Sequence, residues 1–467
     1  MRTVLSSLAL AALLVAPRIA AAQATVTVAP AEATAPVPPR FLGLSFETSA
    51  ILPQPDGRYP FFTADNAGLA KLFHNLGVGN LRIGGNTADT PTVPIPAEKD
   101  IDNLFAFARR ADVRVLYTLR MRDGDPAPAT GAAAYVWGRY GARIDCLAIG
   151  NEPDVFEHHD FAAYTADMNR FLPAVEQAAP GAPLCGPGTT GGDPAWAAKY
   201  TDAFGRTPHL AYVTQHLYPG GNGKKIASIE AGRAQLLSPD IDDKYARYAE
   251  AFLPGIKAAG LKFRLEETNN FHHAGAEGVS NTFTATLWGL GYLNWWLNHG
   301  ADGVNFHTGV TTAAGDALST CWYAVFWQQD GRPVIQPLAY ALKAFSLTAH
   351  GRVLPVHLTG AAASLQAFAT LDDGGAVWLT LINRAHGPDA AAMPVTIGLP
   401  QGYARAQALD LRAEDDDIGA TSGIRLGGAA IDADGGWDGR WRPLRTGPGQ
   451  LIVKVPQASA MIVKMTR

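Results

Sequence analysis

One stretch of the sequence passes abruptly from apolar to polar residues: Leu147-Ala148-Ile149-Gly150-Asn151-Glu152-Pro153-Asp154. Its apolar part has the length and composition of a buried strand. Gly150 lets the backbone approach a neighbour closely, and Pro153 ends the strand and fixes the turn. The stretch therefore predicts a strand that carries a carboxyl group, Glu152, on a stiff rim.

The same pattern recurs on both sides of this stretch. From about residue 41, short apolar runs alternate with longer amphipathic or Ala-rich stretches, which is typical of repeated strand–helix units. Eight strands are predicted, at residues 42–47, 80–84, 113–120, 145–151, 183–186, 212–218, 263–267 and 303–307. Helices are expected at 65–76, 101–110, 161–179, 243–259, 281–298 and 337–349. This order predicts an α/β fold, a (β/α)8 TIM barrel over residues 38–350.

A different pattern begins at residue 351. Short alternating runs recur between Gly, Asp and Pro turns, at residues 365–371, 377–382, 395–399, 451–455 and 461–465. They predict an all-β sandwich domain over residues 351–467. The N-terminal strand predicted within residues 25–37 precedes the barrel, and we expect it to join this β-domain. The Gly- and Asp-rich stretch 414–439 is expected to be a long surface loop.

The N-terminus has the pattern of a signal peptide over residues 1–24. Arg2 precedes a largely apolar segment, and small residues follow at the expected cleavage site. This segment is too short and too poorly flanked for a membrane span, and no later segment is long and apolar enough. We expect a secreted or periplasmic protein.

The composition limits the partners that the protein can have. The chain of 467 residues is 47% hydrophobic and 17% charged, with a net charge of −4. Such a globular composition lacks the basic footprint of nucleic-acid binding, so nucleic acid is not an expected partner. The oligomeric state is left open.

The cysteines are too few for a disulfide framework. Cys146 and Cys185 fall on predicted neighbouring strands, so one bridge between them is possible; the alternative is that these two and Cys321 are buried, inert thiols. No Cys/His cluster has the spacing of a metal site, and we expect neither a metal nor a cofactor.

Two carboxylates stand out, because active sites of TIM barrels lie at the carboxyl ends of the strands. Glu152 follows the fourth strand, while the seventh ends in Glu266 and Glu267, which strand alternation would place on opposite faces. A carboxyl pair on these strands suits glycoside hydrolysis, in which one protonates the leaving oxygen and the other attacks the anomeric carbon. For a retaining enzyme the two carboxyl groups should lie about 5–5.5 Å apart.

Other strand ends supply candidates for substrate binding and support. Tyr218, ending the sixth strand, can hydrogen-bond the neighbouring nucleophile, whereas His216 either lines the pocket or is a satisfied core residue. Arg82 either pairs with a catalytic carboxylate or forms a structural ion pair on the barrel floor. Asn86 and Glu47 can each reach a sugar hydroxyl.

Taken together, these motifs resemble glycoside hydrolase family 79, which contains β-glucuronidases and heparanases. The resemblance covers essentially the whole mature chain. It is carried by Asn151-Glu152-Pro153, Glu267-Thr268-Asn269-Asn270, Leu81-Arg82-Ile83-Gly84-Gly85, Phe41-Leu42-Gly43-Leu44-Ser45-Phe46-Glu47 and the stretch from residue 278 to 307.

The resemblance implies specific roles. Glu152 falls on the acid/base of the family and Glu267 on its nucleophile, which precedes Thr and then Ser or Asn. Glu47 matches an acidic sugar-binding residue, and Asn86 and Asn151 match sugar-contacting positions.

The loop after the seventh strand departs from the family pattern. Glucuronidases of the family tend to carry a Tyr followed by glycines, which bind the glucuronate carboxylate. Here the matching stretch is Phe271-His272-His273-Ala274-Gly275. His272 or His273 can donate to a carboxylate instead, and Lys224 and Lys225 are a second source of positive charge.

The resulting prediction is a retaining exo-β-glycosidase with a carbohydrate substrate, and in particular a β-glucuronidase. One alternative has the same mechanism with a neutral or modified sugar, such as a β-glucoside, a β-xyloside or a 4-O-methyl-glucuronide. The other is a non-catalytic barrel that only binds glycans, which the presence of both Glu152 and Glu267 disfavours.

Overall fold

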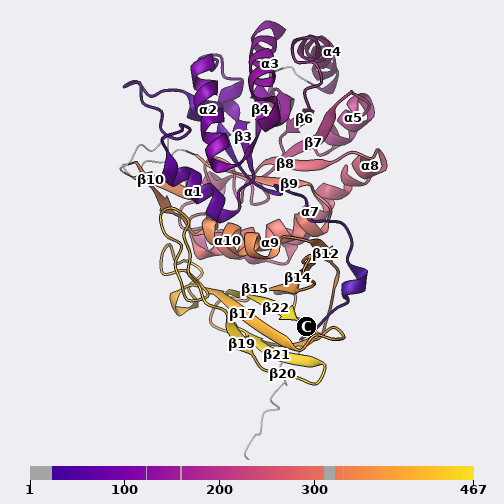
Figure 1. Ribbon diagram of the computed structural model, residues 1–467, viewed down its shortest axis with the longest axis vertical. Coiled ribbons are helices and arrows are strands. Elements are labelled where there is room, and N and C mark those ends of the chain that lie inside the picture. Colours follow the sequence, from indigo (N-terminus) through magenta and orange to yellow (C-terminus); the bar gives the residue numbers. More distant parts are fainter. Residues whose placement is uncertain (1–23, 123, 158–159, 310–320, 330) are drawn as a thin grey trace, which may run out of the picture.

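The computed structural model describes residues 24–122, 124–157, 160–309, 321–329 and 331–467. A barrel forms one end of the molecule and a β-domain the other, with two helices packed between them (Figure 1). The signal peptide predicted at residues 1–24 lies outside the described residues except for Ala24. Within the described part of the chain, no helix is long and apolar enough to cross a bilayer.

Eight parallel strands close into the barrel, which confirms the predicted fold class. In order around the barrel they are β2 (Leu42–Glu47), β3 (Asn80–Gly84), β4 (Arg114–Leu119), β5 (Ile144–Ile149), β6 (Leu184–Thr189), β7 (Leu210–Leu217), β8 (Phe263–Thr268) and β9 (Gly303–His307). Pairing of β2 with β9 completes the closure. The apolar runs that predicted these strands are buried, because helices cover the outside of the sheet.

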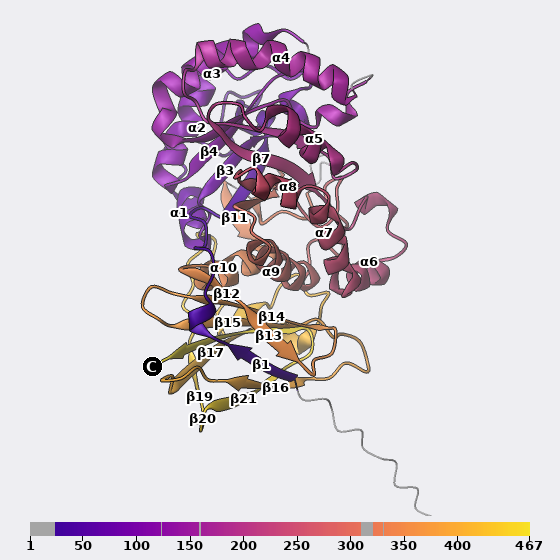
Figure 2. The same ribbon diagram turned by 90° about the vertical axis from the view of Figure 1, so that its right-hand side faces the viewer.

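The helices lie outside the barrel (Figures 1 and 2). They are α1 (Ala67–Leu76), α2 (Glu98–Ala111), α3 (Pro126–Tyr140), α4 (Phe161–Ala178), α5 (Ala195–Phe204), α6 (Ile229–Leu237), α7 (Asp240–Glu250), α8 (Leu253–Ala258), α9 (Phe283–Asn298) and α10 (Leu338–Thr348). The single helix expected at 243–259 is wrong, since two helices, α7 and α8, occupy this part. Pro254 lacks the N–H that would bond Glu250 and continue α7.

The β-domain consists of two sheets around a common apolar core. One sheet has the order β13 (Val356–Thr359), β1 (Ala24–Val28), β16 (Met393–Gly398), β21 (Gln450–Val455) and β20 (Thr446–Gly447). The other has the order β12 (Arg352–Leu354), β14 (Leu365–Leu371), β15 (Val377–Asn383), β22 (Ser459–Thr466), β17 (Arg405–Arg412) and β18 (Arg425–Leu426), with β19 (Arg442–Leu444) also on β17. The N-terminal strand β1 pairs antiparallel with β13 and parallel with β16, as Figure 2 shows.

The stretch 414–439 is mostly irregular and at least partly exposed, as its Gly and Asp content predicted, but a few of its residues are buried and anchor it. Ile424, Leu426 and Ile431 are buried, and the carbonyl groups of Ile418 and Ala420 accept hydrogen bonds from the start of α9. These scattered apolar residues pack the stretch against the barrel, so that it joins the two domains. Because turn residues dominate the stretch, its sequence does not indicate that these apolar residues are buried.

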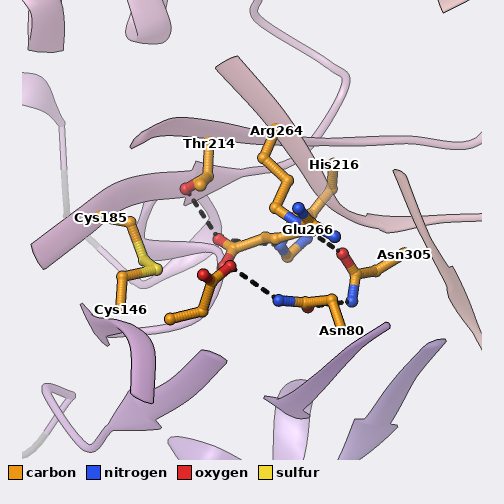
Figure 3. Close-up of a disulfide and its surroundings, with 9 residues drawn as sticks. Asn80, Cys146, Cys185, Thr214, His216, Arg264, Glu266 and Asn305 are labelled. Carbon is orange, nitrogen blue, oxygen red and sulfur yellow. Dashed lines mark hydrogen bonds and ion pairs between the residues drawn. A yellow bond between two sulfur atoms is a disulfide. The ribbon is translucent and has the colours of Figure 1, made fainter. Parts of the chain in front are cut away.

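A disulfide joins β5 to β6 inside the barrel. Cys146 and Cys185 are bonded, with Cα atoms 5.8 Å apart, and both are buried (Figure 3). The ladder between these strands has only two residue pairs, so the covalent bond reinforces a short contact. Cys321 is free and buried.

Candidate active site

The carboxyl ends of the eight barrel strands surround the mouth of the barrel, and the predicted carboxylates lie there. Glu152 follows β5, Glu267 lies near the end of β8, and His216 lies between them on β7. The Nδ1 atom of His216 is 2.9 Å from Glu152 Oε1 and 3.9 Å from Glu267 Oε1. One oxygen of Glu152 lies within 4.8 Å of one oxygen of Glu267. The structure therefore brings the two predicted catalytic glutamates together.

The backbone at Glu152 holds an unusual conformation. Its φ of 48° lies in the left-handed region, which a residue other than glycine rarely adopts. The Glu152 N–H donates to the carbonyl of Gly188 at 2.9 Å, which ties the turn to the end of β6. Its side chain is 16% exposed, while that of Glu267 is 9% exposed. Strain of this kind persists where surrounding contacts fix it, and here it aims the carboxyl group into the mouth.

Glu267 is held by two hydrogen-bond donors and lies close to a histidine ring. Arg82 Nη1 on β3 donates to its Oε2 at 2.6 Å, and the Tyr218 hydroxyl after β7 donates to its Oε1 at 2.8 Å. The ring of His307, at the end of β9, lies 3.7 Å from Oε2. Burial raises the pKa of Glu267, but the charges of His307, His216 and Arg82 outweigh it and hold that pKa below its usual value. Glu267 is thus a buried, ionised carboxylate.

The end of β8 differs from the expectation that only one of its two glutamates enters the barrel. Gln215 pairs with Leu265 and His216 with Glu267, so Glu266 is an extra residue in a β-bulge. The bulge breaks the two-residue alternation, and both carboxyl groups approach the His216 ring. Glu266 Oε1 is 3.6 Å from His216 Nε2. Figure 3 shows Glu266 inside the barrel, next to Thr214 and His216.

Glu47, at the end of β2, lies on the other side of the mouth. Its Oε2 accepts hydrogen bonds from the Thr87 backbone and hydroxyl at 2.8 and 2.6 Å, and its Oε1 is 3.5 Å from His307 Nε2. Gly85 has a φ of 69°, and a Cβ there would lie 2.4 Å from the Glu47 carboxyl carbon. The glycine thus makes room for this acid.

Asn151 and Asn86 lie together beside Glu152. Arg82 Nη2 donates to Asn151 Oδ1 at 2.6 Å, and Asn151 Nδ2 is 3.4 Å from Oδ1 of the exposed Asn86. Asp89, fully buried, accepts from the backbone N–H of Asn151 at 2.6 Å. Arg82 therefore contacts both Asn151, which follows β5, and Glu267, rather than forming an ion pair on the barrel floor.

The loop after β8 is arranged around its two histidines. Nδ1 of His272 lies 2.6 Å from Nδ1 of His273, and the His272 ring packs on Tyr218 with centroids 6.1 Å apart. His272 is half-buried and His273 exposed. Burial, together with the charges of His273 and Lys225, lowers the pKa of His272.

The remaining residues predicted in this region lie behind the histidines or beside them. The Ala274 carbonyl accepts from the Trp322 N–H at 2.7 Å, and Gly275 is buried, where a Cβ would lie 2.9 Å from Ser280 Oγ. Lys224 and Lys225 are exposed on the loop after β7. Of the residues predicted to bind a sugar carboxylate, only His272, His273, Lys224 and Lys225 can present a polar side chain to a ligand.

Several residues of the site were not predicted from the sequence. Ser45 Oγ accepts a hydrogen bond from Arg82 Nη1 at 3.1 Å. Ser45, His307 and Asp89 have no local signal comparable with Asn-Glu-Pro, although His307 ends β9 and its place at a strand end makes it a candidate. Tyr323 is buried beside Tyr218, with ring centroids 6.1 Å apart. Its chain position, far from any barrel strand, gave no indication of this contact.

The side chains of Glu152, His216 and Glu267 are of the types that bind metal ions. Their facing atoms are engaged by one another and by Arg82 and Tyr218. We assign no metal or cofactor to them, and the expectation that none is required stays a prediction.

No family model matches the chain, and no curated protein matches it in sequence. Many solved structures match its fold. The 4-O-α-L-rhamnosyl-β-D-glucuronidase of Fusarium oxysporum 12S has a TM-score of 0.77 at 18% identity, over 94% of this chain and 99% of that one. The GH51 arabinofuranosidase of Xanthomonas axonopodis pv. citri has a TM-score of 0.70 at 14% identity, over 95% and 100%.

A monomeric β-xylosidase from Caulobacter crescentus CB15 is also similar, with a TM-score of 0.60 at 14% identity, over 94% and 99% of the two chains. At these identities the comparisons establish the fold. The chain has the same arrangement of barrel and β-domain as these three enzymes, whereas membership of glycoside hydrolase family 79 stays a prediction.

Proposed function

We propose that the protein is a retaining exo-β-glycosidase, with Glu152 as acid/base and Glu267 as nucleophile. The observation that carries the proposal is the carboxyl pair at the ends of β5 and β8, with oxygens within 4.8 Å of each other. Retaining enzymes place the two groups about 5–5.5 Å apart, whereas inverting enzymes need about 6.5–9.5 Å for an intervening water. The separation supports retention.

In the first step, Glu267 attacks the anomeric carbon while Glu152 gives its proton to the departing glycosidic oxygen. The bond to the leaving group breaks as the glycosyl–Glu267 ester forms. Arg82 and Tyr218 keep Glu267 ionised and oriented before the attack. Their hydrogen bonds also stabilise the carboxylate as a leaving group in the second step.

In the second step, Glu152 takes a proton from water, and the resulting hydroxide attacks the anomeric carbon. The ester bond breaks, which regenerates the Glu267 carboxylate and leaves the proton on Glu152. Two inversions give a product with the starting β configuration. Glu47, Asn86 and Asn151 face the same mouth and are the groups proposed to bind the sugar hydroxyls.

For the sugar we propose a β-glucuronide. A buried glucuronate carboxylate needs donors, and His272, His273, Lys224 and Lys225 supply N–H groups on the loops that follow β8 and β7. The Fusarium enzyme of the same fold is a 4-O-α-L-rhamnosyl-β-D-glucuronidase, whose structure holds Rha-GlcA. This likeness supports a uronic-acid substrate.

A neutral sugar is the second candidate, because the same loop offers a specific observation in its favour. The Nδ1–Nδ1 contact requires one histidine to accept from the other, so the two rings cannot both be fully protonated while it persists. The charge available to a carboxylate is therefore smaller than two histidines would suggest.

A panel of nitrophenyl β-glycosides separates these possibilities. We expect the glucuronide to give the highest kcat/KM when it is compared with the glucoside, xyloside and galactoside. A neutral glycoside preferred by a wide margin would contradict the glucuronidase proposal and leave the carboxyl pair unaffected. Binding of glycans without turnover of any of them would favour the non-catalytic barrel.

The histidines should determine how glucuronide turnover depends on pH. If they donate to the carboxylate, kcat/KM for the glucuronide falls more steeply with rising pH than that for the glucoside. The lowered pKa of His272 places the extra fall below pH 6.5, the ordinary imidazole value. His272→Ala and His273→Ala should each raise KM for the glucuronide about tenfold, with little change for the glucoside.

His74→Ala is the matched control, because His74 is exposed on α1. Equal changes in KM for both substrates would show that the pair does not contact the sugar carboxylate.

A further inference from the structure

Glu266 is a fourth carboxylate near the site, after Glu47, Glu152 and Glu267, and the two-step reaction above does not use it. It is 1% exposed and lies in the interior of the barrel, below Glu267. Its Oε1 accepts from the Thr214 hydroxyl at 2.9 Å, and no hydrogen bond to its Oε2 is found in the described residues. A buried carboxylate is unfavourable without a compensating charge, so its nearest cation matters.

That nearest cation is the His216 ring. The Nε2 atom lies 3.6 Å from Glu266 Oε1 and makes no hydrogen bond within the described part of the chain, while Nδ1 lies 2.9 Å from Glu152. The imidazole therefore connects the buried carboxylate with the acid/base. Gly188 makes room for this arrangement, since a Cβ there would lie 2.2 Å from Glu266 Oε1.

We propose that Glu266 is a positioning residue, whose buried negative charge keeps His216 protonated and turned toward Glu152 and offsets the positive charge of that ring, which would otherwise favour loss of the proton that the cluster donates in the first step. This inference rests on the proposed glycosidase function. A single imidazole ring links the two carboxyl groups. Glu266 interacts with its Nε2 atom, and its Nδ1 atom interacts with Glu152.

The charges of the cluster explain why a fourth carboxylate is useful. Beside Glu266 the cluster contains Glu47, Glu152 and Glu267, and its cations are Arg82 and the protonated rings of His216 and His307. The cluster therefore has four carboxylates and three cations, and it is neutral when it binds one further proton. We identify this proton with the one that is donated in the first step. Without Glu266, the same protonation state would have a charge of +1.

The groups that face the pair from all sides are consistent with this role. Burial lowers the pKa of His216, but the Glu267 charge and the contacts with Glu152 and Glu266 raise it to about 10. Burial raises the pKa of Glu266, and His216, Arg82 and Thr214 lower it below its usual value. Tyr164 of α4 and Tyr200 of α5 are neutral, because burial and the Glu266 charge raise both pKa values.

The pH profile of Glu266→Gln tests the proposal, since glutamine has nearly the same shape without the charge. Removing a negative charge lowers the proton affinity of the cluster, so the alkaline limb of kcat/KM should move to lower pH by about one unit. Glu266→Asp keeps the charge and should restore most of the limb. A Glu266→Gln limb that coincides with that of the wild type, in a folded protein, would overturn the proposal.

A second measurement depends on neither activity nor the stability of a Glu266 variant. In wild-type protein labelled with 15N-histidine, the His216 signals, identified by their loss in His216→Asn, should show both ring nitrogens protonated up to about pH 9. Titration near pH 6.5 would contradict the proposal. If the nitrogens are protonated but no glycoside is turned over, the proposed function fails and the Glu266–His216 contact does not.

Discussion

Glu267→Gln should reduce kcat/KM by a factor of about 10⁴ or more, with the protein remaining folded. The amide cannot form the glycosyl ester, and it loses the charge that Arg82 and Tyr218 stabilise. In Glu267→Ala the space beside the anomeric carbon is open to a small anion. Azide should therefore restore turnover of an activated substrate and give a glycosyl azide of inverted configuration.

Glu266→Gln is the matched control, because it makes the same chemical change one residue earlier on β8. It should keep substantial activity at its own pH optimum, since Glu266 lies behind His216 rather than in the mouth. An inactive Glu266→Gln beside an active Glu267→Gln would mean that the roles of the two residues are reversed.

Arg82→Met should affect both stability and catalysis. The guanidinium is fully buried and bonds Glu267 at 2.6 Å and Asn151 at 2.6 Å. Its removal leaves a buried carboxylate without its cation, and breaking a buried pair in this way costs about 3–5 kcal/mol of unfolding free energy. Misplacement of Glu267 and of the turn that carries Glu152 should also lower kcat/KM by about 10²-fold or more. Urea unfolding and activity per folded molecule measure the two effects separately.

Arg264→Met provides the comparison for this experiment. Arg264 is also a fully buried arginine on a barrel strand, but it bonds Asn305 at 2.7 Å on the barrel floor. It should lose stability while the folded molecules keep their kcat/KM. Equal losses of kcat/KM in the two variants would show that Arg82 acts only through the stability of the barrel.

The barrel could be predicted because its signal is local. Each strand is a short apolar run that ends in polar residues, and Glu152 follows one such run directly. The failures have equally local causes. Strand β17 carries Arg405, Asp410 and Arg412 among its apolar residues, which masked its alternation, and Pro254 divides a stretch that was predicted as one helix.

The site was predictable only in part, because its contacts join residues far apart in the chain. The two glutamates could be proposed from their strands, but the bulge that admits Glu266 to the interior depends on the register between β7 and β8. The sequence of one strand does not determine how it pairs with its neighbour. Likewise the contact between His272 and His273 depends on a loop in which His273 and Ala274 both have positive φ.

The stereochemistry of the first product tests the central claim most directly. Proton NMR of the wild-type reaction, recorded before the released sugar equilibrates, distinguishes the two anomers. Double displacement by Glu267 and Glu152 predicts that the β anomer forms first and that the α anomer accumulates later by mutarotation. An α anomer formed first would show a single displacement by water, and would contradict the assignment of Glu267 as nucleophile.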